Sequence, residues 1–117
     1  MKRRILIVDD ERAIADSLAA ILGPTSEVHV AYSGRQALEI AGLVKPNVLL
    51  TDVVMPDTNG IEVASRVSDA LPNCKILLFS GSVTAADLRA RRCEKWEILS
   101  KPIHPRDLLF TINRLTA

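Results

Sequence analysis

Short apolar runs that recur along the 117-residue chain restrict its fold more than any other feature of the sequence. Runs of this length and composition are typical of buried strands, and the segments between them carry the apolar spacing of helices. Alternating strands and helices favour an α/β fold, in which a mostly parallel sheet is covered by helices on both faces. We therefore expect five strands, near residues 4–8, 27–31, 47–51, 75–79 and 96–99, with helices in the intervals and at the end.

Boundary signals support helices in these intervals. Gly23 and Pro24 would end the first helix, and Pro105, with His104 before it as a cap, would begin the last. Capping boxes, in which two side chains satisfy each other's backbone N–H groups, are expected at the other three helices. Their residue pairs are Ser33 and Gln36, Asn59 and Glu62, and Thr84 and Asp87.

Polar residues stand at the ends of four predicted strands. They are Asp9 and Asp10, Asp52, Ser80, and Lys101. In an open parallel sheet, the groups just past the carboxyl ends of the strands converge on one crevice. Like charges at close range raise one another's pKa, so this cluster is explained best if a divalent cation and a phosphoryl group bind there.

Each of these residues also has a simpler interpretation when it is taken alone. Asp9 and Asp10 could cap the following helix, Ser80 could be a turn residue, and Lys101 a solvated surface charge. The cap interpretation fails for Asp52, because the next helix is expected only near residue 60. The placement of all of them at strand ends favours a shared site.

Four motifs built on these residues resemble the receiver domain of two-component response regulators. The motifs are Val8-Asp9-Asp10-Glu11, Asp52-Val53-Val54-Met55-Pro56 with Gly60 after it, Ser80-Gly81, and Lys101-Pro102. The resemblance runs from Arg4 to about Leu115. It implies a single receiver domain over residues 1–117 with a flavodoxin-like (βα)5 fold. The implied five-stranded parallel sheet has the order 2-1-3-4-5, with the first and third strands adjacent.

The resemblance also assigns roles to the acidic residues. It implies that Asp52 is the nucleophile that accepts a phosphoryl group and becomes an aspartyl phosphate. It further implies that Mg²⁺ binds directly to Asp10, Asp52 and the backbone carbonyl of Val54, with Asp9 acting mainly through water.

The same resemblance implies roles for Lys101 and Ser80, and a set of partners. The Lys101 ammonium and the Ser80 hydroxyl would contact the phosphoryl oxygens, and a cis peptide between Lys101 and Pro102 would aim the lysine inward. The donor would be a sensor histidine kinase or a histidine phosphotransfer protein, and the output a contact with a downstream protein. A homodimer is left open. The only reactions expected are the protein's own phosphorylation and dephosphorylation, so it would be a signalling switch and no metabolic enzyme.

Two features depart from the usual receiver pattern. Most receivers carry Tyr or Phe three residues before the lysine, where Ile98 stands here, so the usual aromatic switch is in doubt. Trp96 is the nearest aromatic substitute, although a packed or partner-facing anchor is the simpler interpretation of this residue. Val54 and Ser82 lie where receivers tune the attack of water, and neither has an amide or carboxylate, which favours slow hydrolysis.

The predicted fourth helix, residues 85–95, has more basic than large apolar residues. These basic residues are Arg89, Arg91, Arg92 and Lys95. A solvated face is the simpler interpretation. The alternative is a docking surface for an acidic partner, which would form part of a signalling face together with the fifth strand and the last helix.

Composition excludes several classes of function. Fifteen basic and fourteen acidic side chains give a net charge of +1, so the whole molecule has no attraction to nucleic acid or to anionic membranes. No segment is apolar for long enough to span a membrane. Cys74 and Cys93 lack metal or redox spacing and are expected to be small packing residues in a cytoplasmic protein.

Three alternatives remain open. The chain could be the receiver part of a longer regulator, or a pseudo-receiver that serves as a constitutive interaction module. It could also be a phosphatase with an aspartyl nucleophile, although such enzymes typically have Asp-x-Asp after the first strand, whereas Asp9 and Asp10 are adjacent.

Overall fold

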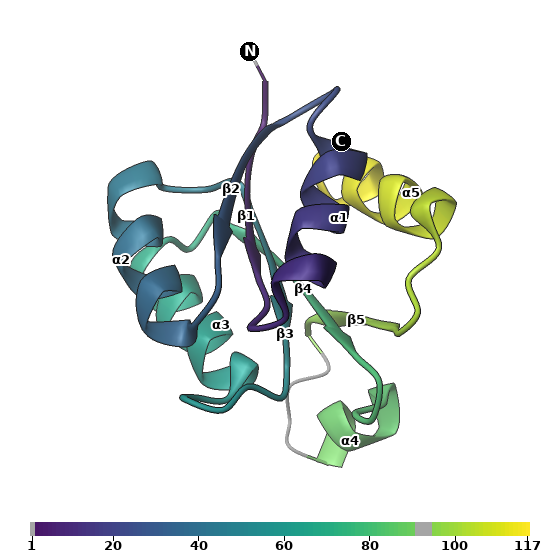
Figure 1. Cartoon of the computed structure of the whole chain (residues 1–117). Coiled ribbons are helices and arrows are strands. Elements are labelled where there is room, and N and C mark those ends of the chain that lie inside the picture. The colour runs from purple at the N-terminus through teal and green to yellow at the C-terminus, as the bar shows by residue number, and fades with distance from the viewer. Residues whose placement is uncertain (1, 91–94) are drawn as a thin grey trace.

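The structure, a computed structural model, describes residues 2–90 and 95–117, in which strands and helices alternate. Figure 1 labels these elements. In chain order they are β1 (Arg4–Val8), α1 (Arg12–Leu22), β2 (Glu27–Ala31), α2 (Gly34–Val44), β3 (Val48–Asp52), α3 (Gly60–Ala70), β4 (Lys75–Ser80), α4 (Ala85–Ala90), β5 (Glu97–Ser100) and α5 (Pro105–Leu115).

The five strands form one parallel sheet in the order β2-β1-β3-β4-β5, which confirms the predicted fold and strand order. β3 and β5 each begin one residue later than the sequence pattern predicts. β3, β4 and β5 each end one residue later than predicted, so Asp52 and Ser80 are the last residues of β3 and β4. Both take part in the ladder, where Asp52 pairs with Phe79 and Ser80 pairs with Ser100.

Apolar side chains form two clusters, one on each face of the sheet. The first packs the sheet against α2 and α3 and also includes Leu88 of α4 and Trp96. The second packs the opposite face against α1 and α5. Figure 1 shows the same layering, with α2 and α3 on one side of the strands and α1 and α5 on the other. We call the first of these the α2/α3 cluster.

Most of the predicted helix caps are present. The Ser33 hydroxyl accepts a hydrogen bond from the Gln36 N–H, and His104 Nδ1 accepts one from the Arg106 N–H. The return half of the box predicted for Ser33 and Gln36 is wrong, because the Gln36 side-chain oxygen accepts from the Tyr32 N–H instead. Thr84 forms its predicted box: its hydroxyl accepts from the Asp87 N–H, and the Asp87 carboxylate accepts from the Thr84 N–H.

The box predicted for Asn59 and Glu62 is wrong in one half. Asn59 Oδ1 caps the Ile61 N–H, but the Glu62 carboxylate accepts hydrogen bonds from the Thr58 hydroxyl and from Arg66. A basic residue one turn further along α3 competes for this carboxylate, so it does not turn back to the backbone.

Cys74 is 7% exposed in the α2/α3 cluster, in agreement with a packing role. Burial raises the pKa of its thiol to about 11, so the thiol stays protonated at neutral pH. Cys93 lies outside the described residues.

Candidate functional site

The acidic residues lie at the carboxyl ends of β1 and β3, the two adjacent strands that form the topological switch point of the sheet. β1 and β3 are neighbours, Asp9 directly follows β1, and Asp52 ends β3. One carboxylate oxygen from each of Asp9, Asp10 and Asp52 lies within 4.8 Å of the others. Asp9 is fully buried and Asp52 is 5% exposed, whereas Asp10 is exposed. The structure therefore brings the three predicted carboxylates together.

Asp9 does not cap α1, whose N-cap position is Glu11 and carries no side-chain cap, but it holds the turn that leads to the helix. Its Oδ1 accepts a hydrogen bond from the Glu11 N–H at 2.9 Å, next to the start of α1. Its Oδ2 faces the pocket, where it lies 3.3 Å from Lys101 Nζ. One carboxylate oxygen thus holds the local backbone, and the other contributes charge to the site.

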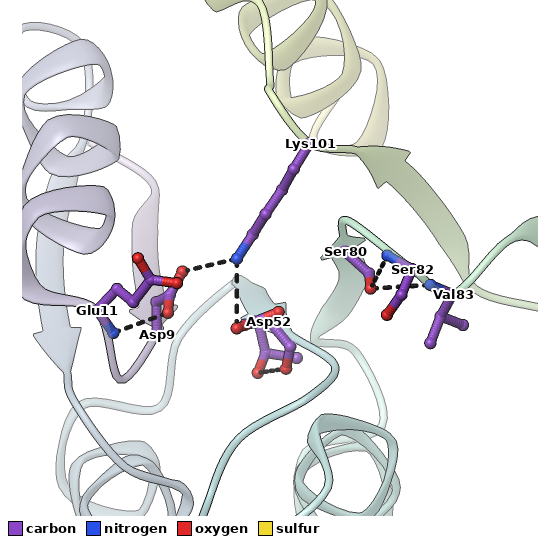
Figure 2. Close-up of polar contacts among 8 residues, drawn as sticks. Asp9, Glu11, Asp52, Ser80, Ser82, Val83 and Lys101 are labelled. Carbon is purple, nitrogen blue, oxygen red and sulfur yellow. Dashed lines mark hydrogen bonds and ion pairs between the residues drawn. The ribbon is translucent and has the colours of Figure 1, made fainter.

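Lys101 bridges the two buried carboxylates. Its Nζ lies 3.3 Å from Asp9 Oδ2 and 3.4 Å from Asp52 Oδ2, and Figure 2 shows the side chain extended between them. The Lys101–Pro102 peptide is cis, as expected. Burial alone would lower the pKa of Lys101, but the ion pairs with Asp52 and Asp9 outweigh it and raise the pKa above its ordinary value.

The negative charge of Asp52 is unfavourable in this pocket. Burial, together with the nearby charge of Asp9, raises the pKa of Asp52 from 3.8 to about 6, although Lys101 and a hydrogen bond from the Val53 N–H act in the opposite direction. One ammonium therefore compensates only part of the negative charge, and a further cation would stabilise the ionised form.

The loop between β3 and α3 folds back over Asp52. The Gly60 N–H donates to the Val53 carbonyl at 2.7 Å, and Val54 forms a bridge with Asn59. A Cβ at Gly60 would lie 1.9 Å from the backbone oxygen of Asp52, so only glycine fits there. The Val54 side chain is 59% exposed.

The Ser80 hydroxyl does not point at the carboxylates. Its oxygen accepts hydrogen bonds from the Ser82 N–H at 3.1 Å and the Val83 N–H at 3.0 Å, and Figure 2 shows it turned toward these residues. Ser80 is 2% exposed at the end of the strand beside β3. It is thus close to the pocket but is engaged with the loop that leads to α4.

Three of the four predicted switch and interface residues, Arg89, Trp96 and Ile98, are described by the structure. Trp96 is 9% exposed and shares the α2/α3 cluster with Ile98, so the interpretation as a packed residue is the one the geometry supports. Arg89 is exposed on α4. Arg92 lies outside the described residues.

Two contacts near the pocket were not expected from the sequence. The Phe79 ring centroid lies 5.1 Å from Lys101 Nζ, and the Asp57 carboxylate accepts hydrogen bonds from the Gly34 and Arg35 N–H groups at the start of α2. The contact between Phe79 and Lys101 could have been predicted, because Phe79 directly precedes Ser80 at the end of the strand. Nothing in the sequence indicates the second, because it depends on the path of a loop.

The donor set suits a hard divalent cation. Mg²⁺ prefers oxygen ligands, usually one or two carboxylates with water and phosphate oxygens, and the pocket offers carboxylates at graded exposure. Asp10, as the exposed member, is the one most accessible to an entering ion.

A family model described as the response regulator receiver domain matches residues 5–113 of the chain. The chain belongs to the response regulator receiver family. It is therefore a receiver domain of two-component response regulators, a class of signalling switches.

Individual relatives agree with this assignment. The chain is 35% identical to the response regulator receiver protein CpdR of Brucella abortus (strain 2308), over 97% of this chain and 96% of that protein. It is 30% identical to the response regulator protein VraR of Staphylococcus saprophyticus, over 71% of this chain but 41% of that protein. The crystal structure of a CheY-like receiver domain protein from Methanospirillum hungatei JF-1 matches with a TM-score of 0.90 and 30% identity, covering 99% of this chain and 95% of that one. This receiver sequence thus spans nearly all of one relative and less than half of another.

Among the described residues, no helix is both long enough and apolar enough to cross a membrane.

Proposed function

We propose that the chain is a phosphoacceptor that receives a phosphoryl group on Asp52 from a sensor histidine kinase or a histidine phosphotransfer protein. The observation that carries this proposal is the joint position of Asp52, two further aspartates within 4.8 Å, and the Lys101 ammonium 3.4 Å away. A nucleophilic carboxylate beside compensating cations is what phosphoryl transfer requires of a protein.

In the proposed reaction an Asp52 oxygen bonds to phosphorus while the P–N bond of a phosphohistidine breaks and its electron pair leaves with the imidazole. Asp10, Asp52 and the Val54 carbonyl would hold Mg²⁺, with Asp9 acting through water. When bound, this ion neutralises charge on the carboxylates and phosphoryl oxygens. Lys101 is already positioned beside Asp52, so its ammonium can turn from the carboxylates to a phosphoryl oxygen.

Ser80 would link the phosphoryl group to the rest of the domain. If its hydroxyl rotates to donate to a phosphoryl oxygen, the Ser82 and Val83 N–H groups lose their acceptor. The Val83 side chain packs against the same cluster that contains Leu88 of α4 and Trp96. Movement of this loop would therefore reach α4 through apolar packing.

The packing of Val83 against the α2/α3 cluster supports signalling through a face formed by α4, β5 and α5. A downstream protein would bind this face, and a second copy of the chain could bind it to form a homodimer. This signalling requires no aromatic ring at residue 98, since Ile98 needs only to repack within the cluster. Arg89, which is exposed, would contact an acidic partner. Arg92 is proposed for the same role from the sequence alone, since it lies outside the described residues. Slow hydrolysis of the aspartyl phosphate, from the side chains of Val54 and Ser82, also remains part of the proposal.

We treat residues 1–117 as one receiver domain that acts in the cytoplasm, on its own or within a longer regulator. The chain covers nearly all of CpdR but less than half of VraR, so relatives of both forms are known and both stay part of the proposal. The acidic cluster argues against the pseudo-receiver, because a constitutive interaction module has no need of three adjacent carboxylates. The adjacent order of Asp9 and Asp10 argues against the aspartyl phosphatase.

Intact mass spectrometry after incubation with acetyl phosphate and Mg²⁺ tests the proposal. We expect a single phosphoryl adduct that is absent when EDTA is added and absent from Asp52→Ala. Asp69→Asn, which removes an exposed carboxylate on α3, is the matched control and should be labelled like the wild type. No adduct on the wild type, or an adduct that survives Asp52→Ala, would contradict the proposal.

A further inference from the structure

Phe79 lies directly beneath the functional lysine. It is fully buried, is the penultimate residue of β4, and pairs in the sheet with Asp52 on one side and Leu99 on the other. The ring centroid is 5.1 Å from Lys101 Nζ, within the range over which an ammonium is attracted to the face of an aromatic ring. The ammonium therefore has three partners, two carboxylates and one ring.

This contact differs from the other cation–ring contacts among the described residues. Arg12 over Tyr32 and Lys95 over Trp96 both use exposed cations, so water screens the attraction. The side chain of Lys101 is only 21% exposed, and the Phe79 ring beside it is fully buried. Cation–ring attraction is stronger when the pair is removed from water.

We propose that Phe79 is a positioning residue for Lys101 that keeps its ammonium beside the phosphoacceptor. The inference rests on the function proposed above. A divalent cation that binds the carboxylates weakens their hold on the lysine and also repels it. The ring is uncharged and does not bind the metal, so its attraction for the ammonium persists. A leucine would keep the site apolar and fill most of the space of the ring, but it would not attract the cation.

A double-mutant cycle with Lys101 tests whether Phe79 acts through this lysine. We expect Phe79→Leu to lower the rate constant of labelling by acetyl phosphate, at saturating Mg²⁺, by roughly 3- to 10-fold. In a Lys101→Ala background the same substitution should change the residual rate by less than about 2-fold, because the coupled partner is gone. An equal loss in both backgrounds would overturn the inference, since it would assign the effect to packing.

Fluorinated phenylalanine at residue 79 covers the case in which Phe79→Leu fails to fold. Fluorine withdraws charge from the ring face with little change in shape, so the rate should fall stepwise from one to five fluorines. The same series at Phe110, which is 68% exposed on α5, is the control and should leave the rate unchanged. A flat series at residue 79 would overturn the inference.

NMR of the lysine side chains gives a readout that needs no phosphorylation. The ring should shift the ε-methylene protons of Lys101 upfield, and Phe79→Leu should remove this shift. Lys95, 5.0 Å from the Trp96 ring, is an internal reference that should not change. Unaltered Lys101 resonances would overturn the inference. A wild type that never forms an adduct would overturn the proposed function, whereas ring variants labelled at the wild-type rate would overturn only the role of Phe79.

Discussion

The centre and one edge of the sheet differ in how firmly the core holds them. All residues of β3 are buried, whereas every residue of β5 is half-buried or exposed. α3 buries four residues against the sheet, while α4 contributes only Leu88 among its described side chains. The proposed phosphoacceptor thus ends a strand whose position is fixed, whereas α4 and β5, two of the three elements of the proposed signalling face, are held by few buried side chains and can rearrange at little cost.

The loops that leave the two regions differ in the same way. The loop after β3 is held by Gly60 against the backbone of Asp52 and by Asp57 at the start of α2. The loop after β4 is held by two hydrogen bonds to the Ser80 hydroxyl, the group that the phosphoryl group would recruit. The first loop would keep its shape on phosphorylation and the second would lose two hydrogen bonds, which explains how one chemical event could move only one region.

Gly60→Ala should produce the largest effect and tests the rigidity of the central region. A Cβ would lie 1.9 Å from the Asp52 oxygen and 2.8 Å from its carbonyl carbon, so the backbone would have to move. We expect the free energy of unfolding, measured by urea denaturation, to fall by about 3 kcal/mol or more.

Gly42→Ala is the matched control for this substitution. A Cβ at residue 42, within α2, would meet nothing within 4 Å, and alanine should stabilise the helix by up to about 1 kcal/mol. If Gly60→Ala stayed within about 1 kcal/mol of the wild type, the β3 loop would be as adaptable as the β4 loop, and the comparison would fail.

The sequence predicted what depends on topology and missed what depends on the path of a loop. Asp9, Asp10, Asp52 and Lys101 converge because parallel strands end at the same edge, and this follows from their order in the chain. The tight approach of Gly60 to Asp52 could not be read from the sequence, because it arises only after the loop folds back.

The direction of side chains could not be predicted from the sequence either. The position of Ser80 was predicted, but its hydroxyl has two competing uses, at the pocket and at its own loop, and the sequence does not choose between them. The register that pairs Phe79 with Asp52 likewise depends on how β3 and β4 align.

Asp52→Asn should have an intermediate effect, of opposite sign to that of Gly60→Ala. Burial and Asp9 raise the pKa of Asp52 to about 6 in the folded protein, so the folded state favours the protonated form. The free energy of unfolding of the wild type therefore falls as the pH rises from about 4 to about 6. At pH 7 without divalent cations, the asparagine variant should be more stable than the wild type by up to about 2 kcal/mol.

Urea denaturation of both proteins at pH 3.5 and pH 7 measures this effect. The two proteins should differ little at the lower pH, where Asp52 is protonated in the folded state and mostly protonated in the unfolded state. Millimolar Mg²⁺ at pH 7 should stabilise the wild type more than Asp52→Asn. A wild type that is the more stable protein at pH 7 without metal would show that Lys101 compensates the pocket fully.

The smallest effect expected is a difference between two helix caps, one in each region. Ser33 caps α2 through the Gln36 N–H, and Thr84 caps α4 through the Asp87 N–H, so Ser33→Ala and Thr84→Ala each remove one backbone cap of the same kind. Thr84→Ala also removes the hydrogen bond that the exposed Thr84 hydroxyl donates to the Asp87 carboxylate. Loss of such a cap costs about 1 kcal/mol. For Ser33→Ala we expect this cost in the global free energy of unfolding, because α2 packs on the sheet through Ala37 and Ala41.

For Thr84→Ala we expect most of the cost to appear as local opening. The described part of α4 has six residues, of which Leu88 is the one given as buried, so this segment can open while the sheet stays folded. Amide hydrogen exchange within residues 85–90 should therefore become several-fold faster, while the urea transition shifts by less than about 0.5 kcal/mol. If both variants lowered global stability equally and exchange in α4 were unchanged, α4 would be as much a part of the cooperative core as α2. The loosely held region would then have to begin at β5.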